Sequence, residues 1–131
     1  MKIQESAENY LETIYVLSKR NGTVRSIDIA NELGFTKASV SVAMKNLREE
    51  EYVITDADGT LNLTQKGLDV AERVYERHEI IAGALMALGV DEETAYADSC
   101  KIEHHISAAS VEKIKQHLVS KNIFKVKKSN K

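Results

Sequence analysis

Residues 26–48 read SIDIANELGFTKASVSVAMKNLR, two short helical patterns separated by a glycine. We expect Ser26 to cap the first helix and Gly34 to end it. The second pattern, residues 36–48, repeats its apolar side chains at helical spacing. A short helix, a turn after glycine, and a second helix that begins with small polar residues predict a helix-turn-helix. An ordinary helical hairpin is the simpler alternative.

A hairpin pattern follows directly. Residues 51–55 and 60–64 predict two short strands, with Asp58-Gly59 in the turn between them. Thr64 is expected to cap the helix that comes next. Two strands after a helix-turn-helix make a winged helix. We therefore expect residues 1–65 to form a winged helix-turn-helix DNA-binding domain.

One more helix is predicted before this motif. Its apolar side chains recur at helical spacing up to Leu17, Ser6 is expected to cap it, and Gly22 to end it. Asn9 and Glu12 stand three residues apart and share one face of this helix. Taken alone, these two residues are more simply a polar helix edge.

The second half of the chain predicts three helices and little else. A long helix carries His78 within its apolar stripe and ends at Gly89, a second runs from Asp91 through Ser107, and a third covers about 110–118. These helices are too apolar to remain uncovered, so we expect residues 66–118 to form an all-helical dimerisation domain. Residues 119–131 form a basic tail. The expected fold class is mainly α.

The most unusual local sequence is DSCKIEHHIS, residues 98–107. If it is helical, Cys100, Glu103 and His104 fall at positions i, i+3 and i+4 and project from one face. Sulfur, oxygen and nitrogen donors together suit a first-row transition metal. Three residues do not complete a coordination sphere, however. A solvated helix with one buried cysteine and two surface histidines is the simpler alternative.

The composition excludes several classes of protein. The 131 residues include 43% hydrophobic and 29% charged residues and no proline, which suits a helical globular protein. A single cysteine excludes an internal disulfide framework and suits the reducing cytoplasm, where we expect the protein to be. No apolar run approaches the ~20 residues of a membrane span. Because the net charge is −2, nucleic-acid binding would depend on a local basic patch.

The order of these motifs resembles the diphtheria toxin repressor family of metal-dependent transcriptional repressors. The similarity is strongest to its short manganese-responsive (MntR-like) branch, which lacks the SH3-like domain. It rests on ENYLETIY at residues 8–15, on the winged helix, on YERHE at 75–79, and on CKIEHHIS at 100–107. The resemblance implies a repressor that binds double-stranded operator DNA as a homodimer, with no small organic substrate.

The resemblance also implies a metal site that joins the first helix to the dimerisation helices. Its ligand positions fall on six residues: Asn9, Glu12, His78, Cys100, Glu103 and His104. The expected ion is Fe2+ or Mn2+, for which Zn2+ or Co2+ can substitute. Glu12 follows the manganese branch, Cys100 follows the iron branch, and Asn9 stands where the manganese branch has aspartate. Because a thiolate is a soft ligand, the hybrid set favours Fe2+ over Mn2+.

The predicted DNA contacts lie mainly at the start of the recognition helix, where hydroxyl and ammonium groups can reach base edges and phosphates. They are Arg25, Thr36, Lys37, Ser39, Ser41 and Lys45. In a two-fold dimer the two recognition helices must lie ~34 Å apart to enter successive major grooves. We expect the metal to favour that geometry, with a coupling of ~1–3 kcal/mol.

Two other functions remain open from the sequence. A metalloenzyme would need a catalytic motif such as His-Glu-x-x-His, but Ala82 stands four residues after His78. Alternatively, a winged-helix regulator without metal control would use Cys100 as a redox sensor. Oxidation, rather than metal removal, would then release DNA.

Overall fold

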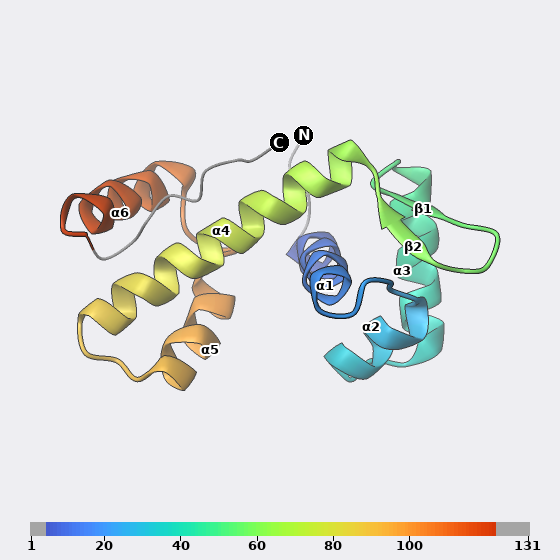
Figure 1. The fold of residues 1–131 in the computed structure, drawn as a ribbon, viewed down its shortest axis with the longest axis horizontal. Helices are drawn as coiled ribbons and strands as arrows, with labels where there is room; N and C mark the ends of the chain where they lie inside the picture. Colours follow the sequence, from blue (N-terminus) through green and yellow to red (C-terminus); the bar gives the residue numbers. More distant parts are fainter. Residues whose placement is uncertain (1–4, 123–131) are drawn as a thin grey trace. The chain divides into compact units, whose positions relative to one another are not determined.

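The structure, a computed structural model, describes residues 5–122. The elements there are α1 (Glu5–Asn21), α2 (Ser26–Leu33), α3 (Lys37–Glu49), β1 (Val53–Thr55), β2 (Leu61–Leu63), α4 (Gln65–Ala87), α5 (Glu92–Ile102) and α6 (Ala108–Ser120) (Figure 1). The chain divides into two compact units, one ending at Val74 and the other beginning at Tyr75. No helix within residues 5–122 has the length and apolar character needed to cross a bilayer.

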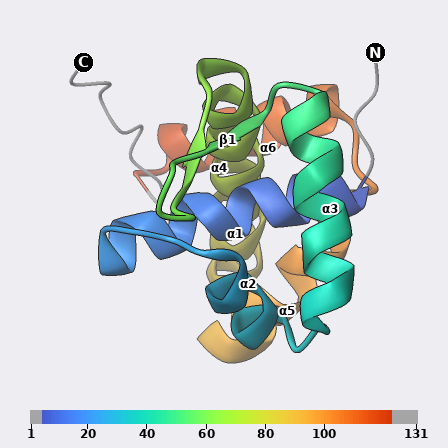
Figure 2. The same ribbon diagram turned by 90° about the vertical axis from the view of Figure 1, so that its right-hand side faces the viewer.

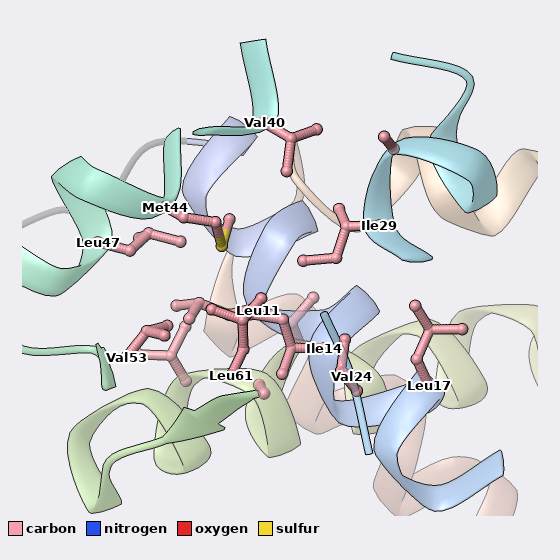
Figure 3. Close-up of a cluster of buried hydrophobic side chains, with 14 residues drawn as sticks. Leu11, Ile14, Leu17, Val24, Ile29, Val40, Met44, Leu47, Val53 and Leu61 are labelled. Carbon is pink, nitrogen blue, oxygen red and sulfur yellow. The ribbon is translucent and has the colours of Figure 1, made fainter. Parts of the chain in front are cut away.

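The first unit is built around one apolar core. Side chains from α1, α2, α3 and both strands meet in it (Figure 3), and Val70, Ala71 and Val74 from the start of α4 join them. Leu11 and Ile14 of α1 are almost completely buried. Each such side chain stabilises the fold by about 1.5–3 kcal/mol relative to an exposed one. Because only one face of α1 packs into this core, its apolar residues recur at helical spacing.

The helix-turn-helix is confirmed, and α2 and α3 lie side by side (Figure 2). Gly34 ends α2 with a φ of 71°, and its N–H donates to the carbonyl of Ala30. Thr36 then caps α3, because its hydroxyl accepts a hydrogen bond from the N–H of Ser39 at 3.1 Å. Gly34 takes a left-handed conformation that disfavours a side chain, which is why the turn falls there.

Two of the predicted caps are wrong. Ser26 is the first residue of α2, and Arg25 occupies the capping position. The carboxylate of Asp28 reaches back and accepts a hydrogen bond from the Arg25 N–H at 2.9 Å, so the helix begins one residue earlier than its serine indicated. Ser6 is likewise the second residue of α1.

The wing is a two-stranded antiparallel hairpin. Val53 pairs with Leu63 and Thr55 with Leu61, so both strands are shorter than predicted. Its inner edge is tied to the segment before α2, since the N–H of Leu61 donates to the carbonyl of Val24 at 2.8 Å. Thr64 caps α4 as predicted, through a hydrogen bond from the Gly67 N–H to its hydroxyl.

In the second unit, α5 and α6 lie beside the later part of α4 (Figure 1). Ile80 of α4 packs with Val111 and Leu118 of α6. The predicted single helix from Asp91 through Ser107 is wrong, because α5 ends at Ile102. Ser107 instead caps α6, its hydroxyl accepting from the Ser110 N–H at 3.1 Å. A tight turn between the two helices therefore holds the sequence EHHI.

Candidate metal centre and nucleic-acid interface

Three potential metal ligands converge in the second unit. His78 comes from α4, Cys100 from α5, and Glu103 from the residue that follows α5. One donor atom from each lies within 4.8 Å of the other two. The Nδ1 of His78 is 3.3 Å from a carboxylate oxygen of Glu103 and 3.8 Å from the sulfur of Cys100. The fold thus brings the imidazole of His78 to a sulfur donor that lies 22 residues later in the chain and to the carboxylate of Glu103 just beyond it.

Glu103 is the buried centre of this group. Its side chain is 1% exposed, and neither carboxylate oxygen accepts a hydrogen bond. Its second oxygen lies 3.3 Å from the Nε2 of His104, whose side chain is also almost fully buried. The carboxylate is therefore flanked by two imidazoles that approach it without hydrogen-bonding geometry. A buried carboxylate is costly unless a cation or strong donor compensates it, so this arrangement fits a divalent metal.

Hydrogen bonds to the backbone hold the two ends of the cluster in place. The hydroxyl of Ser99 donates to the carbonyl of His78 at 2.6 Å, which links α5 to α4 directly beside the imidazole. The guanidinium of Arg77 donates to the carbonyl of Glu103 at 2.9 Å, beyond the end of α5. These two bonds fix the main chain from which both ligands project. Sequence reasoning missed them, since their acceptors are carbonyl groups common to all residues.

The ring of Tyr96 packs against the imidazole of His78, with 5.3 Å between centroids. Its hydroxyl donates to the carboxylate of Glu79 at 2.8 Å. Burial, followed by the hydrogen bond to Glu79, raises the pKa of Tyr96 to about 12. Tyr96 is therefore a neutral hydrogen-bond donor at physiological pH, and its ring covers one side of the His78 imidazole.

The predicted ligands do not all share one helix face. Cys100 and Glu103 do, because Glu103 keeps helical dihedral angles at the end of α5, but His104 lies in the following turn. The simpler alternative of a buried cysteine and surface histidines is also wrong in part, because Cys100 is exposed and the side chain of His104 is 2% exposed. Asn9 and Glu12 belong to α1 in the first unit, and their assignment as ligands remains a prediction.

The charged side chains of α3 are basic up to Glu49, where the helix ends. Residues 37–48 include Lys37, Lys45 and Arg48 and no carboxylate, although the whole chain carries a net charge of −2. The predicted contacts Lys37, Ser39, Ser41 and Lys45 are all exposed. A local basic patch of this kind is what a protein of net negative charge needs in order to bind nucleic acid.

Two predicted DNA contacts also have structural roles. The hydroxyl of Thr36 caps α3 and donates to the hydroxyl of Ser39 at 2.9 Å. The guanidinium of Arg25 lies against the wing tip, where a Cβ added to Gly59 would be 2.7 Å from it. Hydrogen bonds from Thr60, and to a smaller extent the charge of Arg25, lower the pKa of Asp58. Arg25 thus offsets part of the negative charge at the wing tip.

A winged helix, followed by a helical unit with converging nitrogen, sulfur and oxygen donors, defines the class of metal-dependent transcriptional regulators. Comparison with known protein families supports this class. Residues 2–61 match the N-terminal DNA-binding domain of the iron-dependent repressors, and residues 64–120 match their metal-binding and dimerisation domain. The chain belongs to the iron-dependent repressor family.

The curated relatives are transcriptional regulators rather than enzymes. The chain is 39% identical to the HTH-type transcriptional regulator MntR of Bacillus subtilis (strain 168) over 109 residues, which is 83% of this chain and 77% of that protein. It is 37% identical over 109 residues, with the same coverage, to MntR of Geobacillus kaustophilus (strain HTA426). The chain is therefore a metal-dependent, DNA-binding transcriptional regulator, and neither the metalloenzyme nor the purely redox-sensing alternative is favoured.

Solved structures of metal-dependent regulators have a similar fold. The manganese regulator SloR is 29% identical with a TM-score of 0.76, and the match covers 91% of this chain and 55% of that one. ScaR with bound Zn2+ is also 29% identical, with a TM-score of 0.73 and coverage of 86% and 53%. The chain thus spans about half the length of these two structures.

Proposed function

We propose that this chain forms a homodimeric repressor whose affinity for operator DNA rises when it binds Fe2+ or Mn2+. One observation carries the proposal: the buried carboxylate of Glu103 faces His78 and Cys100 at family ligand positions, and its oxygens accept no hydrogen bond. A bound divalent ion would supply a fixed positive charge to this carboxylate, which otherwise has the imidazoles of His78 and His104 beside it and no hydrogen-bond donor. A repressor of this kind would act in the cytoplasm, beside the DNA it controls.

His78, Cys100 and Glu103 form the part of the proposed site that rests on geometry. His104, beside the second oxygen of Glu103, is the fourth proposed ligand. The family resemblance adds Asn9 and Glu12 of α1. An asparagine offers only a neutral carbonyl oxygen, so Glu12 is expected to contribute more to affinity than Asn9.

The donor set bears on the choice of metal. Carboxylates and imidazoles accept any of the first-row divalent ions, whereas a thiolate favours Fe2+, Co2+ or Zn2+ over Mn2+. Cys100 therefore supports Fe2+ as the physiological signal, with Mn2+ the alternative. Metal binding requires Cys100 as a thiolate, so binding releases a proton when the thiol is protonated.

DNA recognition is assigned to α3, whose exposed hydroxyl and ammonium groups suit the major groove. A homodimer would present two such helices to half-sites one helical turn apart. The metal can raise the affinity for DNA only to the extent that it binds the DNA-binding conformation more tightly than the other conformation. A coupling of ~1–3 kcal/mol corresponds to a change of about 5- to 150-fold in DNA affinity.

The test is anaerobic DNA binding by the full chain in Fe2+, Mn2+, Zn2+ or chelator, with duplexes selected from a random-sequence pool. We expect tight binding with metal and a loss of at least fivefold in chelator. Glu103→Gln and His104→Ala should bind weakly in every condition. Glu93→Gln, which changes an exposed carboxylate of α5, is the matched control and should behave as wild type. Equal affinity in chelator and in all metals would refute metal control.

Oxidation separates the redox alternative from this proposal. Under anaerobic conditions, the redox model predicts wild-type DNA binding by Cys100→Ser in both metal and chelator. The metal model predicts that Cys100→Ser responds more weakly to Fe2+ than wild type does. A Cys100→Ser variant with an unchanged Fe2+ response would remove this residue from the ligand set.

A further inference from the structure

Val42 is an apolar side chain that is not part of the hydrophobic core. It lies in the middle of α3 and is 61% exposed. The opposite side of the helix buries Val40, Met44 and Leu47 in the core. A β-branched residue is slightly unfavourable in a helix, and an exposed one gains nothing from burial. Folding alone therefore does not explain a valine here.

The surroundings of Val42 favour a nucleic acid over a protein as its partner. Residues three and four positions away on a helix are neighbours, and here they are Ala38, Ser39, Lys45 and Asn46, all exposed. Ser39, Asn46 and Lys45 provide a hydroxyl, an amide and an ammonium group, Ala38 adds only a methyl group, and no carboxylate lies between residues 37 and 48. Protein-binding patches are broader and more apolar than one isolated valine. Val42 is the one large exposed apolar side chain of α3, and it is set within a mostly polar, cationic surface that complements phosphate.

The major groove of DNA presents one apolar group at base edges, the 5-methyl group of thymine. Valine offers neither a donor nor an acceptor, so it cannot satisfy the amino group of cytosine or the N7 and O6 of guanine. Against those bases it would leave a polar group unpaired. We propose that Val42 is a specificity-determining residue that selects a thymine in each operator half-site by contact with its methyl group. The inference rests on the proposed DNA binding by α3.

The test begins with duplexes selected from a random pool by the full-length wild-type protein with Fe2+ under anaerobic conditions. Each thymine of the selected half-site is then replaced in turn by deoxyuridine, which removes only the methyl group. At one position we expect about fourfold weaker binding per half-site, from ~0.8 kcal/mol per buried methyl-sized group. Replacing that thymine–adenine pair by 5-methylcytosine–guanine should be tolerated better than replacing it by cytosine–guanine.

A double-mutant cycle assigns the effect to Val42. The Val42→Ala protein should bind the thymine and deoxyuridine duplexes equally, while retaining its metal response and its melting temperature. Lys45→Ala is the matched control: loss of a phosphate contact should weaken binding to both duplexes by the same factor and preserve their ratio.

Three results would overturn the inference. They are a selected half-site with no deoxyuridine-sensitive position, an unchanged thymine preference in Val42→Ala, and a Val42→Ala protein that loses affinity equally for both duplexes. If no duplex is enriched with metal, the proposed DNA binding fails and this inference fails with it. Enrichment without methyl dependence refutes the role of Val42 alone.

Discussion

Glu103→Gln should make the metal-free protein more stable and the metal-loaded protein less stable. In the wild type the carboxylate is 1% exposed, accepts no hydrogen bond, and lies 3.3 Å from a nitrogen of His78 and from one of His104. A buried unsatisfied group costs about 1–3 kcal/mol, and more when it is charged. Glutamine keeps the shape without the charge. In chelator we therefore expect the variant's free energy of unfolding to exceed that of wild type by ~1–3 kcal/mol.

Bound metal should make wild type more stable than Glu103→Gln, the reverse of the order in chelator. A ligand that binds only the folded state stabilises it by about 2.7 kcal/mol at one hundred times its dissociation constant. Wild type should gain that amount, whereas the variant, which lacks the central carboxylate, should gain little. Two urea titrations of each protein, one in chelator and one in Mn2+, measure all four free energies of unfolding. Glu93→Gln, at an exposed position on α5, should follow wild type in both.

Two outcomes would refute this reasoning. If Glu103→Gln is less stable than wild type in chelator by more than about 1 kcal/mol, the carboxylate is well compensated without metal. If the variant keeps the full stabilisation by Mn2+, Glu103 is not a ligand. Either result would remove the observation on which the metal site rests.

Other variants test the supports of the site and fold. Ser99→Ala removes the hydrogen bond to the His78 carbonyl. In urea titrations the free energy of unfolding should fall by about 1 kcal/mol. In competition with a chelating dye, metal binding should be weaker than in wild type. Cys100→Ser should abolish the sulfur-to-metal charge-transfer absorption of the Co2+-loaded protein, and persistence of that band would exclude the thiolate as a ligand. Gly34→Ala places a side chain at a φ of 71° and should cost ~1 kcal/mol in thermal unfolding, while Gly34→Asn should cost less. The pKa of Tyr96 is raised, so folding opposes its ionisation; in an alkaline titration followed by phenolate absorption, the component near pH 12 should vanish in Tyr96→Phe.

The sequence predicted the parts of the fold that depend on local chemistry. Gly34 and Thr64 have conformational and capping roles that the structure confirms, and the Asp-Gly turn correctly located the wing. The end of α5 was missed because no glycine or proline marks it. Only the capping hydroxyl of Ser107, four residues after Glu103, indicates the break.

The candidate site was predictable only in part. The spacing of Cys100 and Glu103 placed two donors on one side of a helix, but nothing local connects them with His78, 22 residues before Cys100. That link came from the family resemblance, because it depends on how α4 and α5 pack. The supporting bonds from Ser99 and Arg77 end on main-chain carbonyls and have no pattern in the sequence.

The contrast between exposed Cys100 and buried Glu103 has a kinetic consequence. An ion enclosed on every side can leave only when the protein opens, which is slow. Cys100 would hold the ion from the exposed side and Glu103 from the buried side, so a thiolate open to solvent would give water or a competing thiol access to the metal without unfolding of the protein. Rapid exchange of this kind would let occupancy follow the free metal concentration of the cell as it rises and falls.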